Sequence, residues 1–190
     1  LGKDYSEIAG LWVKTPTGVV RNQLATLIED LDVLPFPDRD MYQKYRYFNN
    51  LDSIDVIAGR GCVFNCNYCM NTTLKEMSKG KGTFVRKFSP KYIVSELEEV
   101  KRKFKPKSFT FLDELFTVNK TWVREFAQEY KKRINLPFVC NITADTLDEE
   151  SAYWLAQAGV SRICMGVETG NEEMRGKLLK YITLHRVFLF

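Results

Sequence analysis

The sequence has little of several features that mark common protein classes. It holds one histidine, His185, which lies far along the chain from the other candidate metal ligands. No apolar run approaches the ~18 residues that indicate a membrane-spanning helix. The opening stretch, LGKDYSEIAG, lacks the apolar core of a secretory signal peptide. We therefore expect a cytoplasmic protein without a membrane span, in a compartment where thiols stay reduced.

An excess of charge of one sign is also absent. Lysine and arginine number 28 against 24 aspartates and glutamates, and the net charge of +4 is spread along the chain. The one dense basic run, KRKFKPK at 101–107, suits the end of a helix and the loop after it. Because no basic stripe marks an RNA-binding surface, we expect no nucleic-acid partner.

Cysteine is present, but its number and placement argue against disulfides. The chain has five cysteines, an odd number, and three of them lie within eight positions of the stretch GRGCVFNCNYCMN at 59–71. These three, Cys62, Cys66 and Cys69, form a CxxxCxxC pattern. We therefore interpret them as metal ligands or catalytic groups.

Two parts are expected along the chain, residues 1–49 and residues 50–190. In the first part, IAGLWVK and GVVRN flank TPT, which predicts a hairpin. The stretch LPFPDRD at 34–40 predicts an extended boundary, because proline fixes φ and removes a donor. The chain starts at Leu1 and ends on the apolar run ITLHRVFLF, so we expect a piece from the middle of a longer protein.

From residue 50 on, strand and helix patterns alternate through four β–α units. Ser89 predicts a helix N-cap, Thr146 with Glu149 a capping box, and Gly159 a helix end. The strand segments are apolar on both faces, which predicts a parallel sheet covered by helices. The expected strands are 53–59, 108–113, 137–143 and 161–168, and the expected helices are 89–104, 120–133, 146–159 and a segment from 171 to 181.

The unusual residues of the chain all follow predicted strands. A series of β–α units forms a doubly wound sheet or a barrel, and in both the ligands bind at the carboxyl ends of the strands. The cysteine loop follows the first strand. Asp113 and Glu114 end the second strand, Thr143 and Asp145 follow the third, and Glu168 ends the fourth. The sequence therefore predicts an α/β protein with one site at this edge of its sheet.

The cysteine spacing indicates a metal centre with an open position. Thiolates are soft ligands that select zinc, copper(I) or iron–sulfur clusters. Structural zinc sites and iron–sulfur clusters usually take four protein ligands, whereas the local sequence supplies three. Cys140 and Cys164 lie in predicted strands, where a free cysteine is usually a small buried hydrophobe. An open coordination position is what catalysis requires.

The CxxxCxxC loop after a first strand, with an aromatic residue before its last cysteine, resembles the radical S-adenosylmethionine superfamily. The resemblance covers residues 50–190 and implies a partial (β/α) barrel with about four of the family's six βα units. It implies that Cys62, Cys66 and Cys69 hold a 4Fe-4S cluster whose open iron binds S-adenosylmethionine. Reductive cleavage would give methionine and a 5′-deoxyadenosyl radical, which abstracts hydrogen from a small-molecule substrate.

The same resemblance implies cofactor-binding roles for four other residues. Tyr68 stands where family members place an aromatic residue against the adenine. Asp113 and Glu114, in FLDE, stand where the family often has a Gly-Gly-Glu-type motif for the methionine amine, although this sequence has no paired glycines there. A carboxylate suits an ammonium partner. Glu168, in GVETG, resembles a GVES stretch that contacts the ribose or the methionine part of the cofactor.

The stretch DLDVLPFPDRDMY at 30–42 resembles the segment that joins a cobalamin-binding domain to a radical domain. Residues 1–49 are then the tail of that upstream domain and a linker, and the DxHxxG-type cobalamin signature would lie outside this chain. The resemblance implies cobalamin-dependent methyl transfer in the full-length protein, with an external electron donor such as ferredoxin or flavodoxin.

Other readings of the sequence remain open at this stage. Within the superfamily, the alternatives are a radical cyclase or oxidoreductase and a tRNA methylthiotransferase. Outside it, the alternatives are a non-enzymatic zinc-binding module and a redox thiol protein. Iron with acid-labile sulfide would indicate the enzyme, whereas stoichiometric zinc would indicate the module.

Overall fold

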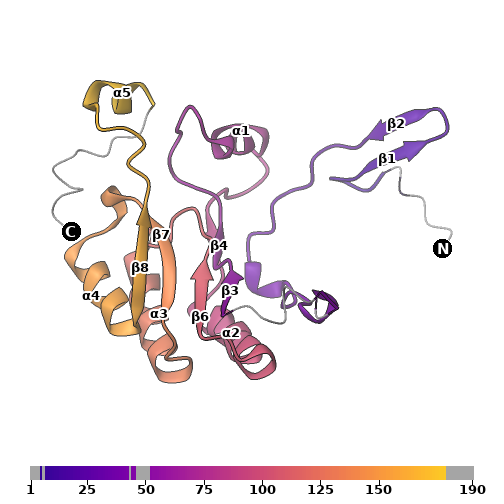
Figure 1. The fold of residues 1–190 in the computed structure, drawn as a ribbon. Helices are drawn as coiled ribbons and strands as arrows, with labels where there is room; N and C mark the ends of the chain where they lie inside the picture. The colour runs from indigo at the N-terminus through magenta and orange to yellow at the C-terminus, as the bar shows by residue number, and fades with distance from the viewer. Residues whose placement is uncertain (1–4, 6, 43, 46–51, 179–190) are drawn as a thin grey trace.

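A four-stranded parallel sheet organises the molecule, in the order β3-β6-β7-β8 (Figure 1). The computed structural model describes residues 5, 7–42, 44–45 and 52–178. Neighbouring strands all run in the same direction. The predicted α/β class is therefore confirmed. The strands are β3 (Ser53–Val56), β6 (Ser108–Phe111), β7 (Phe138–Ile142) and β8 (Val160–Met165).

The strands of the sheet end earlier than the sequence predicts. After β3 the chain leaves the sheet, and β4 (Gly59–Arg60) pairs antiparallel with β5 (Arg86–Lys87). At the end of β6, the N–H of Leu112 still donates to the carbonyl oxygen of Val56 at 2.9 Å. The early ends place the β4–β5 pair before Cys62, and the loop around Asp113, beyond the ends of the parallel strands.

Three helices pack on the sheet, and two of them begin where the sequence predicts. They are α2 (Pro90–Phe104), α3 (Lys120–Arg133) and α4 (Glu149–Ala158). The Ser89 hydroxyl caps α2 by accepting from the N–H of Tyr92. Both α2 and α3 have apolar faces at helical spacing, and these faces are the buried ones.

The capping box predicted at Thr146 is wrong for α4. Asp148 caps this helix by accepting from the N–H of Ser151, and Thr146 lies before it in a 3-10 turn, η4 (Ala144–Thr146). Aspartate is among the best N-cap residues, and this one stands next to the first helical residue. The helix ends as predicted at Gly159, which has φ +95°.

Within the described part of the chain, helices cover one face of the sheet. On β6, Phe109 and Phe111 are buried on that face, whereas Ser108 and Thr110 on the other face are half-buried. On β8 the alternation leaves Cys164 exposed. The expectation of strands that are apolar on both faces is therefore wrong for β6 and β8, as is the expectation of a buried Cys164.

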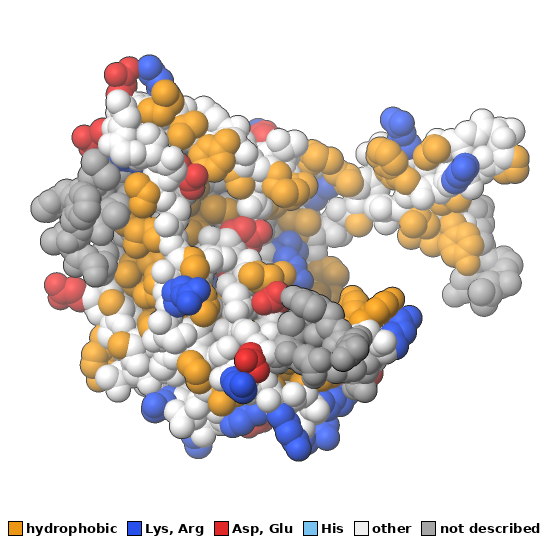
Figure 2. Space-filling model, viewed as in Figure 1, with side chains coloured by type: hydrophobic (Ala, Val, Ile, Leu, Met, Phe, Trp, Pro, Cys, Tyr) orange, Lys and Arg blue, Asp and Glu red, His pale blue; other side chains and the backbone are white. Residues whose placement is uncertain are grey.

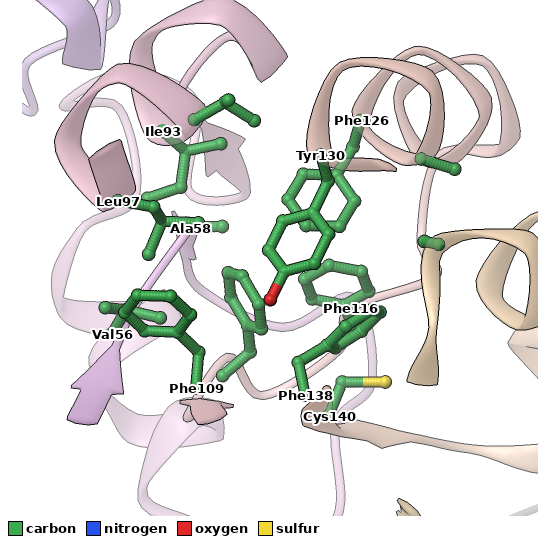
Figure 3. Close-up of a cluster of buried hydrophobic side chains, with 14 of the residues drawn as sticks. Val56, Ala58, Ile93, Leu97, Phe109, Phe116, Phe126, Tyr130, Phe138 and Cys140 are labelled. Carbon is green, nitrogen blue, oxygen red and sulfur yellow. The ribbon is translucent and has the colours of Figure 1, made fainter. Parts of the chain in front are cut away.

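Aromatic side chains fill the space between the sheet and α3 (Figure 3). Such ring pairs contribute ~0.5–1.5 kcal/mol each beyond the area that they bury. Cys140 lies in the same core, and burial raises the pKa of its thiol to about 12, so it packs as a neutral group. Around Phe111, at centroid distances of 4.8 to 6.5 Å, lie Phe116, Phe126, Tyr130 and Phe138.

The N-terminal part forms the predicted hairpin. Its strands, β1 (Trp12–Thr15) and β2 (Gly18–Arg21), pair antiparallel and project away from the sheet with apolar side chains exposed (Figures 1 and 2). Two 3-10 turns follow, η1 (Leu31–Val33) and η2 (Asp40–Tyr42). Between them the chain lies along α2, where Arg39 and Glu96 form an ion pair at 2.7 Å.

Some expectations fall on residues outside the described ranges. The domain boundary at residues 49 and 50 is one of them, and the end of the last predicted helix is another. Among the helices that the structure does describe, none combines the length and the apolar character needed to cross a lipid bilayer.

Asp148 is expected to stabilise α4 as its N-cap and as the ion-pair partner of Lys120. The bond from Lys120 and then the bonds from Ser151 lower the pKa of Asp148 from 3.8 to about 2. Because the folded pKa lies below the unfolded one, this stabilisation is present above about pH 4 and is lost as the pH falls toward about 2. Asp148→Ala should lower the free energy of unfolding by about 1 kcal/mol at neutral pH.

Urea titrations at several pH values measure this effect. The difference between the parent chain and Asp148→Ala should shrink between about pH 4 and about pH 2. Asp148→Asn is the matched control, because asparagine is an equally good N-cap and loses only the exposed ion pair. A difference that persists unchanged at low pH would contradict the assignment.

Candidate active site

The cysteine loop starts at a glycine that fits no side chain. The chain leaves β4 through Gly61 at φ +83°, a conformation that residues with a Cβ rarely adopt. A Cβ at this position would lie 2.4 Å from the backbone oxygen of Phe84, on the returning side of the loop. The backbone therefore requires glycine here for two independent reasons.

Hydrogen bonds fold the loop back between its second and third cysteines. The N–H of Cys69 donates to the carbonyl oxygen of Cys66 at 3.0 Å, and the Thr72 hydroxyl donates to the same oxygen at 2.9 Å. The side-chain amide of Asn71 lies 3.8 Å from Cys69 Sγ. A helix that the sequence analysis did not predict, α1 (Met70–Met77), follows directly and fixes this turn.

The three loop thiols and a carboxylate form one electrostatic group. All three cysteines are free and half-buried. Burial raises the pKa of the Cys62 thiol, and the Cys66, Cys69 and Glu114 side chains raise it further, while a bond from the N–H of Phe64 opposes them. Soft thiolate donors that repel one another fit a cationic iron–sulfur group, which neutralises their charge. Within the described ranges, no three His, Cys, Asp or Glu side chains have the spacing to hold one metal ion.

The two acidic residues after β6 have different surroundings. Asp113 is 2% exposed, and its carboxylate accepts from the N–H of Ala58 at 2.8 Å and from the ammonium of Lys87 at 3.1 Å. Glu114 is exposed and lies close enough to Cys62 to raise the pKa of that thiol. Asp113 is thus bound within the protein, whereas Glu114 offers its carboxylate beside the cysteine loop.

Tyr68 and Glu168, which the sequence singles out in separate stretches, lie together. Partial burial raises the pKa of Tyr68, and hydrogen bonding to the Cys66 sulfur and the Glu168 carboxylate raises it further. The hydroxyl is therefore a protonated donor at neutral pH. Glu168 has φ +69°, which is uncommon for a residue with a Cβ. Backbone strain of this kind clusters at functional sites.

The backbone also joins the cysteine loop to the segment after β8. The side-chain amide of Asn67 donates to the carbonyl oxygen of Lys177 at 2.8 Å, and its N–H donates to that of Leu178 at 3.3 Å. Both acceptors lie at the end of α5 (Glu172–Lys177). Loops that follow the two edge strands therefore meet above the carboxyl ends of the sheet (Figure 1).

Arg175 supports the turn that carries Glu168. An arginine in a short helix is usually exposed, but Arg175 is 1% exposed. Its guanidinium donates to the carbonyl oxygen of Thr169 at 2.5 Å. A buried arginine bonded to the residue next to Glu168 fixes the backbone there.

Other residues at this edge have structural roles. Thr143 begins η4 and lies with its hydroxyl 3.4 Å from that of Thr146. Sequence patterns single out neither Asn141 nor Lys87. The amide of Asn141 donates to the carbonyl oxygen of Asp113 at 3.2 Å, and the ammonium of Lys87 donates to the Asp113 carboxylate. A single asparagine in a strand and one lysine beside an arginine carry no local signal that separates them from ordinary residues.

Comparison with known proteins assigns the chain to a family. The family described as the Radical SAM superfamily matches residues 56–187 of the chain. The chain therefore belongs to the radical SAM superfamily, a superfamily of enzymes, as the resemblance of the cysteine loop implied.

Two curated relatives carry further information. The chain is 26% identical over 187 residues to the "Uncharacterized methyltransferase PH0819" of Pyrococcus horikoshii. The matched region covers 96% of this chain and 39% of that protein. It is 26% identical over 174 residues to the anaerobic magnesium-protoporphyrin IX monomethyl ester cyclase of Synechocystis, with 89% of this chain and 33% of that protein covered. The chain thus spans less than half the length of both relatives.

A solved structure shares the fold. The radical S-adenosylmethionine methyltransferase TsrM of Kitasatospora setae, solved with cobalamin and a [4Fe-4S] cluster, matches with a TM-score of 0.71 at 20% identity. The match covers 98% of this chain and 38% of the TsrM chain. The similarity therefore includes the N-terminal hairpin and linker as well as the parallel sheet.

Gly61→Ala is expected to disrupt cluster assembly. An alanine at this positive φ costs ~1–2 kcal/mol, and its Cβ would also push away the backbone at Phe84. Iron and acid-labile sulfide per chain after anaerobic reconstitution should fall well below the parent value. Gly80→Ala is the control, since Gly80 has φ +74° in the same loop but nothing within 4 Å of the added Cβ. Equal iron content in the two variants would contradict the argument.

Proposed function

We propose that Cys62, Cys66 and Cys69 hold a 4Fe-4S cluster and that S-adenosylmethionine binds beside it over the carboxyl ends of the strands. One observation carries the proposal: the cysteine loop and the Glu168 turn, far apart in sequence, meet through Tyr68. Three thiolate ligands leave one iron of a four-iron cluster open. When bound and reduced, the cluster supplies the electron that cleaves S-adenosylmethionine to methionine and a 5′-deoxyadenosyl radical.

We propose that three side chains near the loop bind S-adenosylmethionine. Glu114 is exposed beside Cys62, so its carboxylate is available to the ammonium of the methionine part. Glu168 accepts from the ribose hydroxyls or from the same ammonium, and Tyr68, which is 50% exposed, offers its ring to the adenine. Asp113, bonded to Ala58 and Lys87, has a supporting role instead of direct contact.

For the overall reaction we propose cobalamin-dependent methyl transfer to a small-molecule substrate by the longer protein that contains this chain. The support comes from the Pyrococcus relative named a methyltransferase and from the fold shared with TsrM. One TsrM structure contains cobalamin with the cluster, and another contains a tryptophan substrate with a SAM analog. An external electron donor of the ferredoxin or flavodoxin type would reduce the cluster.

Radical cyclisation is the second candidate, and the relative named as a cyclase favours it. The two reactions differ in the fate of the methyl group of S-adenosylmethionine. With methyl-labelled S-adenosylmethionine and reductant, a methyltransferase moves the label to cobalamin or to an acceptor. A cyclase leaves the label in methionine and accumulates 5′-deoxyadenosine.

Replacement of any loop cysteine by alanine is expected to abolish the cluster, because each removes one of three protein ligands. Electron paramagnetic resonance of the reconstituted, reduced protein should lose the 4Fe-4S signal in Cys62→Ala, Cys66→Ala and Cys69→Ala. Cys164→Ala is the matched control, since Cys164 is exposed but lies outside the loop. Loss of the signal in this control, or tight stoichiometric zinc in the parent, would refute the assignment.

Glu168→Gln is expected to weaken S-adenosylmethionine binding about tenfold, the effect of losing about 1.4 kcal/mol from a charge-assisted hydrogen bond. The cluster signal should remain, because Glu168 is no ligand of it. Equilibrium dialysis with S-adenosylmethionine measures the affinity. Glu172→Gln, an exposed glutamate in the first turn of α5, serves as the control. Unchanged affinity in Glu168→Gln would remove this residue from the site.

A further inference from the structure

A buried ion pair lies at the base of the cysteine loop, between Lys87 of β5 and Asp113 after β6. We propose that Lys87 and Asp113 are positioning residues that hold the cluster loop and Glu114 in one fixed relation, so that S-adenosylmethionine reaches the open iron in a single geometry. The inference rests on the proposed function, and it assigns both residues an action through their neighbours instead of contact with the cofactor.

The ammonium of Lys87 is enclosed on several sides. Its side chain is 11% exposed and that of Asp113 is 3% exposed, and the two charges lie 3.1 Å apart. The nitrogen also lies 4.1 Å from the centroid of the Trp122 ring and 5.0 Å from that of Phe116. A carboxylate and two aromatic faces therefore hold the ammonium in place.

The Asp113 carboxylate connects the two sides of the loop. One oxygen accepts from the N–H of Ala58, just before the loop, and the other accepts from Lys87, just after it. The N–H of Phe88 donates to the carbonyl oxygen of Ala58 at 3.0 Å, which adds a second link between the same two segments. Because Glu114 follows Asp113 directly, its backbone is fixed to the base of the loop.

The packing around this pair leaves no room for adjustment. A Cβ on Gly59 would lie 2.8 Å from the backbone oxygen of Arg86, 2.9 Å from Lys87 Cγ and 3.2 Å from Asp113 Oδ1. The backbone of β4 therefore approaches the pair so closely that only glycine fits at position 59, and a displacement of Asp113 reaches β4 and β5 through its bonds to Ala58 and Lys87. A shift at Asp113 would therefore move both the first cysteine and Glu114.

Stability alone is a weak reason for a buried ion pair. Desolvation of two charges offsets much of their attraction, and apolar residues of similar volume often stabilise a protein as well or better. A second buried pair, Arg39 with Glu96 at 2.7 Å, joins the segment between η1 and η2 to α2. Both pairs join a basic and an acidic side chain that are largely buried, but only the Lys87–Asp113 pair lies at the base of the cysteine loop. The Arg39–Glu96 pair therefore serves as a control.

The test compares neutral double variants of the two pairs. Lys87→Met keeps the length of the stem, and Asp113→Asn keeps an oxygen for the N–H of Ala58, so Lys87→Met/Asp113→Asn removes both charges with little change of shape. Arg39→Met/Glu96→Gln does the same on α2. Melting temperature, iron content, S-adenosylmethionine affinity and the change of the cluster's electron paramagnetic resonance spectrum on adding S-adenosylmethionine are measured for each.

A positioning role predicts that cluster retention is separable from S-adenosylmethionine affinity and from the spectral response. The Lys87→Met/Asp113→Asn variant should keep its cluster, yet bind S-adenosylmethionine about 10–100-fold more weakly and lose the single, sharp spectral response. The control variant should respond to S-adenosylmethionine as the parent does. Parent-like affinity and spectral response in Lys87→Met/Asp113→Asn would overturn the proposal and leave the pair a purely structural role.

Loss of the cluster and loss of the cofactor response have different meanings. If the double variant fails to retain a cluster, Asp113→Asn alone is measured at low temperature, and parent-like affinity in that variant also overturns the proposal. If the parent itself holds a cluster but shows no response to S-adenosylmethionine, the proposed function fails, and this inference fails with it. The parent's response therefore separates the two failures.

Discussion

The short antiparallel pairing of β4 with β5 is the constraint on which the candidate site depends. Only two residue pairs form it, Gly59 with Lys87 and Arg60 with Arg86. So short a ladder is marginal by itself in water. It closes a long loop that must present three thiols, and it persists because the carboxylate below it bonds to both of its sides. Buried charges thus hold the base of the loop, and hydrogen bonds within the loop fold its cysteine turn.

The parallel sheet supplies the rigid part of the arrangement. Its helices pack on one face around tightly contacting aromatic rings, so the strand ends are held in a fixed spacing. Every loop at the carboxyl edge then starts from a defined point. Residues separated by about a hundred positions in sequence, such as Tyr68 and Glu168, reach each other without either loop having to be stable alone.

Local patterns predicted the elements whose signals are local. The start of α2 follows from its N-cap Ser89, the bounds of α2 and α3 follow from apolar residues at helical spacing, and the cysteine loop follows from spacing alone. The strand ends and the β4–β5 pair depend on contacts between distant segments, so no window of sequence contains them. Asp113 and Glu114 show what local patterns do not distinguish. The two adjacent acids look alike in sequence, but in the structure Asp113 is buried and bonded within the protein, whereas the Glu114 carboxylate is exposed.

At position 168, the backbone conformation favours glycine, whereas the proposed chemistry requires a carboxylate. At φ +69° a glycine would relieve the strain that the glutamate backbone bears. Such a replacement would remove the carboxylate that the Tyr68 hydroxyl meets. Selection for stability alone would therefore drift away from glutamate at this position, and only a demand on the carboxylate itself would keep it.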